Sequence, residues 1–127
     1  MNNILDTHTF IWFIEGDRHL SARARKYIEM DGAGNFLSIA SLWEIAVKVS
    51  LEKIELKKPY AEISGQIDDN GFQILPITFR DTLILSKLPF HHRDPFDRII
   101  ISQSIAGNFN VITKDKSFDE YNLNIIW

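Results

Sequence analysis

Short apolar runs alternate with longer mixed stretches along the chain. The runs are bounded by Gly, Asn, Pro or charged residues, which is typical of buried strands. We expect strands at Asn3–Leu5, Phe36–Ile39, Gln73–Leu75, Asn110–Ile112 and Asn124–Ile126. Because these runs lack polar alternation, they predict a parallel sheet that is covered on both faces.

The stretches between the runs predict helices. We expect them at Thr7–Ile14, Ala22–Met30, Leu42–Leu51, Tyr60–Asp69, Phe79–Leu88 and Pro95–Ala106. Gly and Asn residues follow several of these stretches, as they commonly do at helix ends. Strands that alternate with helices indicate the α/β class, and the length of 127 residues predicts one domain over residues 1–127.

Composition narrows the setting of this domain. Apolar residues make up 45% and charged residues 24%, as in ordinary folded proteins. The longest apolar runs, such as "FIWFI", are too short to span a bilayer, and no basic leader region precedes them. The chain has no cysteine, so it has no disulfide or thiolate metal site. We expect a cytoplasmic protein without membrane association.

The net charge of −3 provides no overall attraction to nucleic acid. A phosphate-rich partner would therefore need a local site. Acidic residues that bind a divalent cation would provide one, because the ion reverses the local sign of the field.

Four acidic residues fall near the same edge of the predicted sheet. Asp6 follows the first strand, and Asp115 follows the fourth in "VITKD". Glu44 lies in the first turn of the helix after the second strand, and Asp97 lies in the first turn of the helix before the fourth. In a parallel wound sheet, ligands bind beyond the carboxyl ends of the strands, where these residues are expected.

Each acid also has a structural interpretation. Ser41–Glu44 has the pattern of a capping box, which recurs at Thr78–Asp81 and Ser117–Glu120. Asp94 is a candidate N-cap followed by proline. Asp6 could cap a helix, and Asp115 could be a turn residue.

Capping alone does not require the four acids to meet at one end of one sheet. Carboxylates brought close together repel and raise one another's pKa unless a cation lies among them. Oxygen ligands without His or Cys favour Mg²⁺ or Mn²⁺, which are suited to phosphodiester hydrolysis.

Five segments together resemble the PIN-domain ribonucleases, and specifically the VapC-type toxins of toxin–antitoxin pairs. They are "ILDTHTFIW", "SIASLWEIAVK", "LPFHHRDPFDRIIISQS", "VITKDKSFDEY" and the final "IIW". The resemblance implies a PIN-like three-layer fold and a Mg²⁺- or Mn²⁺-dependent endoribonuclease. It also implies an RNA substrate, a small antitoxin partner whose tail covers the acidic edge, and a homodimer. The chain departs from the family at Ser50–Ile54, where many relatives have a Gly-Lys-Leu-like turn.

The resemblance assigns the metal ligands to Asp6, Glu44, Asp97 and Asp115, and leaves Asp94 as a cap. Thr7 and Thr113 adjoin ligand positions and are candidates to hold a carboxylate or a water. Arg98 is expected to pair with a neighbouring carboxylate and so position the acids. Three histidines lie near these positions and could have catalytic or surface roles: His8, His91 and His92. Three tryptophans are flanked by apolar residues and are expected in the core: Trp12, Trp43 and Trp127.

Two other functions remain open from the sequence. A haloacid-dehalogenase-like phosphatase also begins with an Asp after its first strand, but it needs a second acid two residues later, where this chain has His8. The other alternative is a non-catalytic α/β binding module, in which the acids are caps and the protein acts through a partner.

Overall fold

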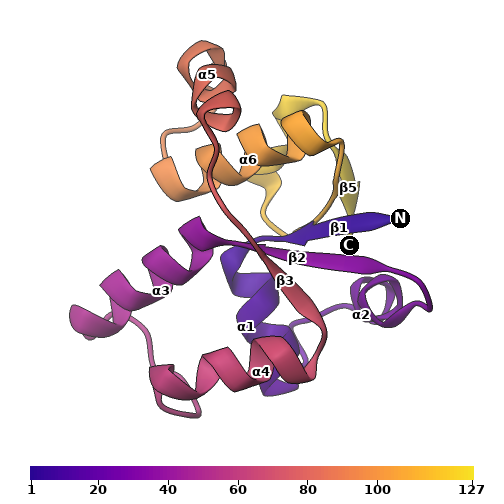
Figure 1. Ribbon diagram of the computed structural model, residues 1–127, viewed down its shortest axis with the longest axis vertical. Helices are drawn as coiled ribbons and strands as arrows, with labels where there is room; N and C mark the ends of the chain where they lie inside the picture. The colour runs from indigo at the N-terminus through magenta and orange to yellow at the C-terminus, as the bar shows by residue number, and fades with distance from the viewer.

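One parallel sheet lies at the centre of the fold, in a computed structural model that describes residues 1–127 (Figure 1). Its strands are β1 (Asn2–Leu5), β2 (Gly34–Ser38), β3 (Phe72–Leu75), β4 (Asn110–Ile112) and β5 (Asn124–Ile126). They are arranged in the order β3-β2-β1-β4-β5, and every neighbouring pair is parallel. The predicted α/β class and all five strands are confirmed.

Helices connect the strands. They are α1 (Thr7–Glu15), α2 (Ala22–Glu29), α3 (Ile39–Ser50), α4 (Ile63–Asp69), α5 (Phe79–Lys87) and α6 (Pro95–Gly107), with 3₁₀ turns η1 (Tyr60–Glu62) and η2 (Lys116–Tyr121). All six predicted helices are present, although the segment predicted as Tyr60–Asp69 begins as η1 before it continues as α4. None of the helices has the length and apolar character needed to cross a bilayer.

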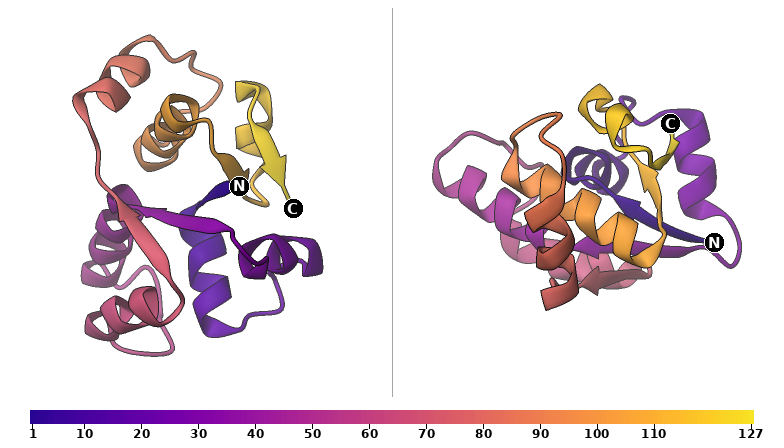
Figure 2. Two further views of the ribbon diagram at one scale, coloured as in Figure 1. Left: turned by 45° about the vertical axis from the view of Figure 1, so that its right-hand side comes forward. Right: turned by 90° about the horizontal axis from the view of Figure 1, so that it is seen from above.

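Helices cover both faces of the sheet, as the two-sided apolar strands predict (Figure 2, left). Successive strand residues point to opposite faces, so Leu5 packs with residues of α1, α2, α3 and α4, whereas Ile4 packs with residues of α6 and η2. Val111 and Ile112 divide between the same two clusters. The fold therefore has three layers and two hydrophobic cores.

The boundary between β2 and α3 differs from the prediction. The strand was expected at Phe36–Ile39 and the helix from Leu42, but β2 ends at Ser38 and α3 begins at Ile39. The side chain of Ser38 caps the helix by accepting a hydrogen bond from the backbone N–H of Ala40 at 3.0 Å. Ser41 is therefore inside the helix, and the capping box predicted there is wrong.

The order of the strands reverses at β1, because the chain passes from β1 to β2 and β3 on one side and then to β4 and β5 on the other. Leu5 pairs with both Leu37 and Ile112, so the carboxyl ends of β1, β2 and β4 lie side by side. A ligand site is expected at such a switch point.

Candidate active site

Asp6 lies directly after β1 and has two structural partners. Its Oδ1 accepts a hydrogen bond from the backbone N–H of Thr9 at 2.9 Å, which caps α1. Its Oδ2 accepts a hydrogen bond from Thr113 Oγ1 at 2.6 Å. Burial raises the pKa of Asp6, and the hydrogen bonds from Thr113 and Thr9 offset this only in part. Asp6 thus caps a helix and also faces the end of β4.

Glu44 is buried in the second turn of α3 rather than in its first, so it does not cap the helix. Its Oε1 accepts a hydrogen bond from Thr7 Oγ1 at 2.7 Å, and Thr7 also bonds with Ser41 at 3.0 Å. Its Oε2 lies 2.6 Å from Lys48 Nζ, one helical turn further along. Capping, the structural interpretation favoured by the sequence pattern, is therefore wrong for Glu44.

Asp94 and Asp97 divide the roles expected of them at the start of α6. Asp94 Oδ1 accepts a hydrogen bond from the backbone N–H of Asp97 at 3.0 Å and caps the helix, with Pro95 at its first position. The Asp97 carboxylate is not needed for capping and lies 3.2 Å from His92 Nε2 through its Oδ2. The pKa of Asp97 rises to about 8, first because of burial and then because of repulsion from Asp94, Asp115, Asp6 and Glu44.

Asp115 follows β4 on the exposed side of the site. Its Oδ1 accepts hydrogen bonds from the backbone N–H and the hydroxyl of Ser117, at 2.9 and 2.8 Å, and so caps η2. Its own N–H donates to Thr113 Oγ1 at 3.0 Å. The capping box expected at Ser117 is wrong, because the cap is Asp115. The Thr113 hydroxyl thus links Asp115 to Asp6.

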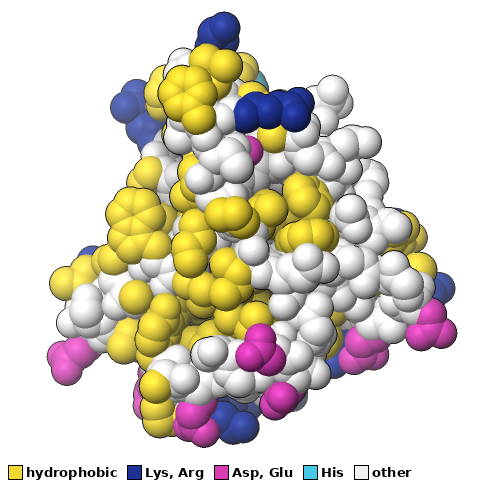
Figure 3. Space-filling model, viewed as in Figure 1, with side chains coloured by type: hydrophobic (Ala, Val, Ile, Leu, Met, Phe, Trp, Pro, Cys, Tyr) yellow, Lys and Arg dark blue, Asp and Glu magenta, His cyan; other side chains and the backbone are white.

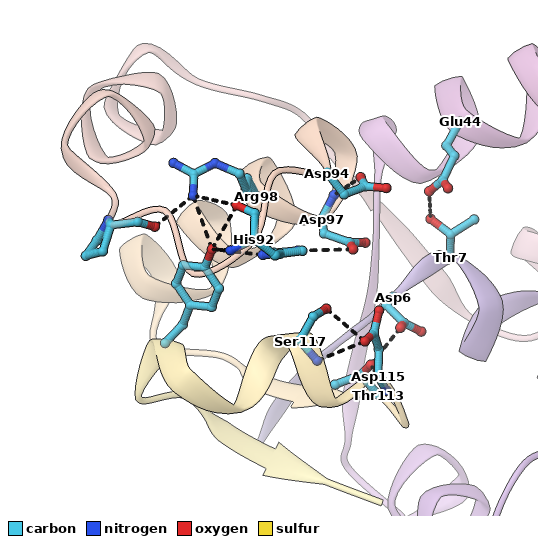
Figure 4. Close-up of polar contacts among 12 residues, drawn as sticks. Asp6, Thr7, Glu44, His92, Asp94, Asp97, Arg98, Thr113, Asp115 and Ser117 are labelled. Carbon is cyan, nitrogen blue, oxygen red and sulfur yellow. Dashed lines mark hydrogen bonds and ion pairs between the residues drawn. The ribbon is translucent and has the colours of Figure 1, made fainter.

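The structure brings the four predicted acids to one region at the carboxyl edge of the sheet (Figure 4). In this view the carboxylate of Asp97 points toward Asp6 and Asp115, and Glu44 approaches from α3. As the side chains stand, no group of three or more acids, histidines or cysteines could hold a metal ion. Each carboxylate instead makes hydrogen bonds or ion pairs with other protein groups, some of them distant in sequence, such as Thr113 with Asp6 and Thr7 with Glu44.

The donor set still fits a hard divalent cation. All four donors are carboxylates, and the charges of the other three raise the pKa of Asp97. Asp97 Oδ1 makes no hydrogen bond within the protein. A cation would relieve this repulsion, and oxygen-only donors favour Mg²⁺ or Mn²⁺ over zinc.

An open cleft of about 390 Å³ adjoins the acids and is lined by Asp6, His8, Trp12, Lys114 and Asp115. It combines the carboxylates with one cation and two aromatic rings. His8 and Trp12 lie on successive turns of α1, with their ring centroids 6.0 Å apart. Two of the four predicted acids, Asp6 and Asp115, therefore face this cleft.

Arg98 differs from its predicted role. It is buried and makes no ion pair with a carboxylate, so the predicted pairing is wrong. Its guanidinium instead donates to the carbonyl oxygens of Leu88 and Pro89, at 3.0 and 2.7 Å, and lies 3.9 Å from the ring centroid of Phe90. Arg98 therefore fixes the loop before α6.

The predicted core position of Trp43 is also wrong, because Trp43 is 61% exposed and packs edge-on against Phe96. Trp12 and Trp127 are half-buried beside the larger core and contact each other. The apolar neighbours of Trp43 suggested burial, but adjacent residues of a helix point in different directions. Leu42 packs against the larger core, whereas Trp43 lies on the outer side of α3.

Several contacting residues were not predicted. Lys48 follows Glu44 by four positions, which is the spacing of a helical ion pair and a usable signal. Ser41 contacts Thr7, the partner of Glu44, and Tyr121 contacts His92, the partner of Asp97. Both contacts form only through tertiary packing, so no local pattern identifies them.

Comparison with known proteins agrees with the predicted PIN-like fold. A model of the PIN domain family matches residues 4–123. No curated relative matches the sequence.

Among solved structures, the chain is similar to VapBC2 from Rickettsia felis, which was crystallised with a DNA fragment from its promoter. The two sequences are 18% identical, the TM-score is 0.73, and the match covers 98% of this chain and 97% of that one. It is also similar to a toxin–antitoxin complex from Klebsiella pneumoniae, with 17% identity, a TM-score of 0.68 and coverage of 98% and 96%. For VapBC-5 from Mycobacterium tuberculosis these values are 16%, 0.62, 98% and 94%.

Proposed function

Because this chain belongs to the PIN domain family, we propose that it is a metal-dependent endoribonuclease and the toxin of a toxin–antitoxin pair. The observation that carries the proposal is the convergence of four acids from four separate segments at the carboxyl edge of the sheet. Capping accounts for the places of Asp6 and Asp115, but it accounts for neither the buried Glu44 nor the Asp97 carboxylate.

Asp6, Glu44, Asp97 and Asp115 would hold Mg²⁺ or Mn²⁺. Such an ion supplies charge stabilisation to a phosphate under attack and makes water a stronger nucleophile at neutral pH. The protein residues set the donors in place: Thr113 holds Asp6, and Thr7 and Lys48 hold Glu44. Because the pKa of Asp97 is raised to about 8, its carboxyl group gives up a proton when a cation binds at neutral pH.

The cleft beside the acids is suited to single-stranded RNA. Lys114 places a positive charge next to Asp115, where it would contact a phosphate. Trp12 and His8 offer ring faces on which a base would stack. Since the whole chain carries a net charge of −3, RNA would be held by these local contacts and by the cation rather than by the overall field.

An apolar face supports the proposed protein partners, a small antitoxin and a second copy of the chain in a homodimer. Hydrophobic side chains gather over the face that carries β3, from α5 at the top to α4 at the bottom (Figure 3). Phe79 is 81% exposed, Trp43 61% and Leu83 48%. Exposed aromatic residues at this density mark protein interaction surfaces. The proposed setting is the cytoplasm, where such a toxin would meet RNA.

Cleavage of total RNA from the source cells by purified protein tests the nuclease. We expect discrete fragments with Mg²⁺ or Mn²⁺, and none with EDTA or with Asp97→Asn. Asp81→Asn is the matched control, because Asp81 is the third helical residue in the confirmed capping box of α5, whose N-cap is Thr78, and it is not among the charges that raise the pKa of Asp97. An asparagine there keeps an acceptor for the Thr78 N–H, so cleavage should persist.

The opposite result favours the binding module. If antitoxin-free protein neither cleaves RNA nor binds Mn²⁺, the four acids have only structural roles. The apolar face would then be the feature through which the protein acts. Fragments that persist in Asp97→Asn would instead point to a contaminating nuclease and would refute the assignment of Asp97.

A further inference from the structure

A chain of hydrogen bonds leads from η2 to the Asp97 carboxylate. Tyr121 Oη lies 2.8 Å from His92 Nδ1, and His92 Nε2 lies 3.2 Å from Asp97 Oδ2. His92 and Asp97 expose only 16% and 17% of their side chains, and Tyr121 is buried. The ring of His92 therefore bridges two buried or half-buried partners with both of its nitrogens (Figure 4).

The partners of Tyr121 determine which nitrogen of His92 carries the proton. Tyr121 Oη accepts two hydrogen bonds, from the backbone N–H of His92 and from Arg98 Nη1, both at 3.1 Å. A phenol oxygen has two lone pairs and one hydrogen, so these two donors occupy both lone pairs. Neither donor can also accept a hydrogen bond, so the hydroxyl hydrogen of Tyr121 must be donated to a third group.

His92 Nδ1 is its nearest acceptor, at 2.8 Å, whereas the His92 carbonyl oxygen is 3.4 Å away. Nδ1 is therefore the acceptor, and the proton of the neutral ring lies on Nε2. That N–H faces Asp97 Oδ2.

We propose that His92 is a positioning residue, held as the Nε2–H tautomer by Tyr121, that fixes the Asp97 carboxylate with Oδ2 toward His92 and Oδ1 toward the other acids. The hydrogen bond from His92 is the only one that the Asp97 carboxylate receives, because Asp94 contacts the Asp97 backbone instead. This inference rests on the proposed function only in taking Asp97 to be a metal ligand.

Arg98 makes this support rigid. It is buried and donates to Tyr121 Oη, to Leu88 O and to Pro89 O, so it ties the loop that carries His92 to η2. Hydrogen-bond partners behind a ligand typically contribute 10- to 100-fold in metal affinity. We expect a contribution of this size from His92.

Two measurements on the full chain test the inference. Nitrogen-15 NMR of the histidine rings in the metal-free protein reports the tautomer without any need for cleavage. We expect Nε2–H for His92 in the wild type and a mixture of tautomers in Tyr121→Phe. Wild-type His92 found as Nδ1–H would overturn the inference.

The second measurement is Mn²⁺ affinity by calorimetry, with folding checked by circular dichroism. His92→Ala should bind Mn²⁺ about 10- to 100-fold more weakly. His92→Gln should recover most of the affinity, because its amide N–H reaches the position of Nε2–H. His91→Ala is the matched control: His91 is in the same loop but contacts Glu120 and the Tyr121 ring instead of Asp97, so affinity should not change.

Wild-type affinity in a folded His92→Ala protein would overturn the inference, as would a His92→Gln variant no better than His92→Ala. RNA cleavage is measured separately. If the tautomer and the affinities are as expected but the wild type cuts no RNA, the nuclease proposal fails and the positioning role of His92 stands.

Discussion

Replacing Asp97 by Asn is expected to stabilise the metal-free protein at alkaline pH. The pKa of Asp97 is raised from its ordinary 3.8 to about 8, so between these values the folded protein holds a proton that the unfolded chain has released. Stability therefore falls as pH rises through this window, and the full penalty is present above about pH 8. Asparagine stays neutral and escapes the penalty, and its side-chain oxygen still accepts the hydrogen bond from His92.

The size of the effect follows from the same pKa. At 1.36 kcal/mol per pH unit, a change from 3.8 to about 8 sets an upper limit of roughly 6 kcal/mol. Asp97 is 17% exposed, and solvent and salt screen the neighbouring carboxylates, so about 2–3 kcal/mol is the realistic expectation. For a chain of this size, that corresponds to roughly 6–12 °C in Tm.

Thermal melts of EDTA-treated protein across pH 3.5 to 9 measure this difference in Tm. The wild type and Asp97→Asn should melt closest together at pH values below the ordinary pKa of 3.8 and separate as pH rises toward about 8, with the variant more stable. Asp81→Asn should keep the wild-type slope, and added salt should narrow the gap. Parallel curves for the wild type and Asp97→Asn would refute the view that the four acids crowd one another. A less stable Asp97→Asn at pH 9 would refute it more strongly.

Three further changes have expected outcomes. Mn²⁺ affinity should rise from pH 6 to 8, by up to about tenfold per pH unit, because binding displaces the proton of Asp97, whose pKa is about 8; calorimetry in two buffers would show the released proton, and a flat profile would contradict this prediction. Arg98→Met should lower the free energy of unfolding in urea by about 2–4 kcal/mol, because it leaves the carbonyl oxygens of Leu88 and Pro89 without their donor. Arg93 is exposed, so Arg93→Met should change this free energy by no more than about 0.5 kcal/mol. Glu52→Gly should raise the free energy of unfolding by about 1 kcal/mol, because the backbone of Glu52 is in the left-handed region (φ 56°), which glycine adopts without strain. An unchanged midpoint of urea unfolding would argue against strain at Glu52.

Local patterns were sufficient for most of the secondary structure and for the N-terminal caps of α5 and α6. The apolar runs located every strand because buried strands need side chains that fit two cores. Asp94 followed by Pro95 located the start of α6, since a helix start needs an acceptor for its free N–H groups and tolerates proline there. These requirements act over a few residues, so the sequence displays them directly.

The start of α3 shows where local patterns became ambiguous. Ser38 and Ser41 are both good capping residues, and Ile39 fits a strand as well as a helix. The pairing of β2 with β3 ends at Ser38 and Leu75, so Ser38 rather than Ser41 becomes the cap and Ile39 begins the helix. This shift of three residues moved Glu44 from a supposed cap into the second helical turn, where it meets Thr7.

The contacts around the acids depended on tertiary structure alone. Thr113 meets Asp6 across 107 positions of sequence, and Tyr121 meets His92 across 29. Acids at strand ends could be predicted to share an edge, because parallel winding sends every strand end the same way. Which hydroxyl, imidazole or ammonium group holds each acid is decided by the strand order β3-β2-β1-β4-β5 and by the packing of α3, α6 and η2 against that sheet. Side chains this far apart in sequence have no local signal, because their contact exists only once the layers have packed.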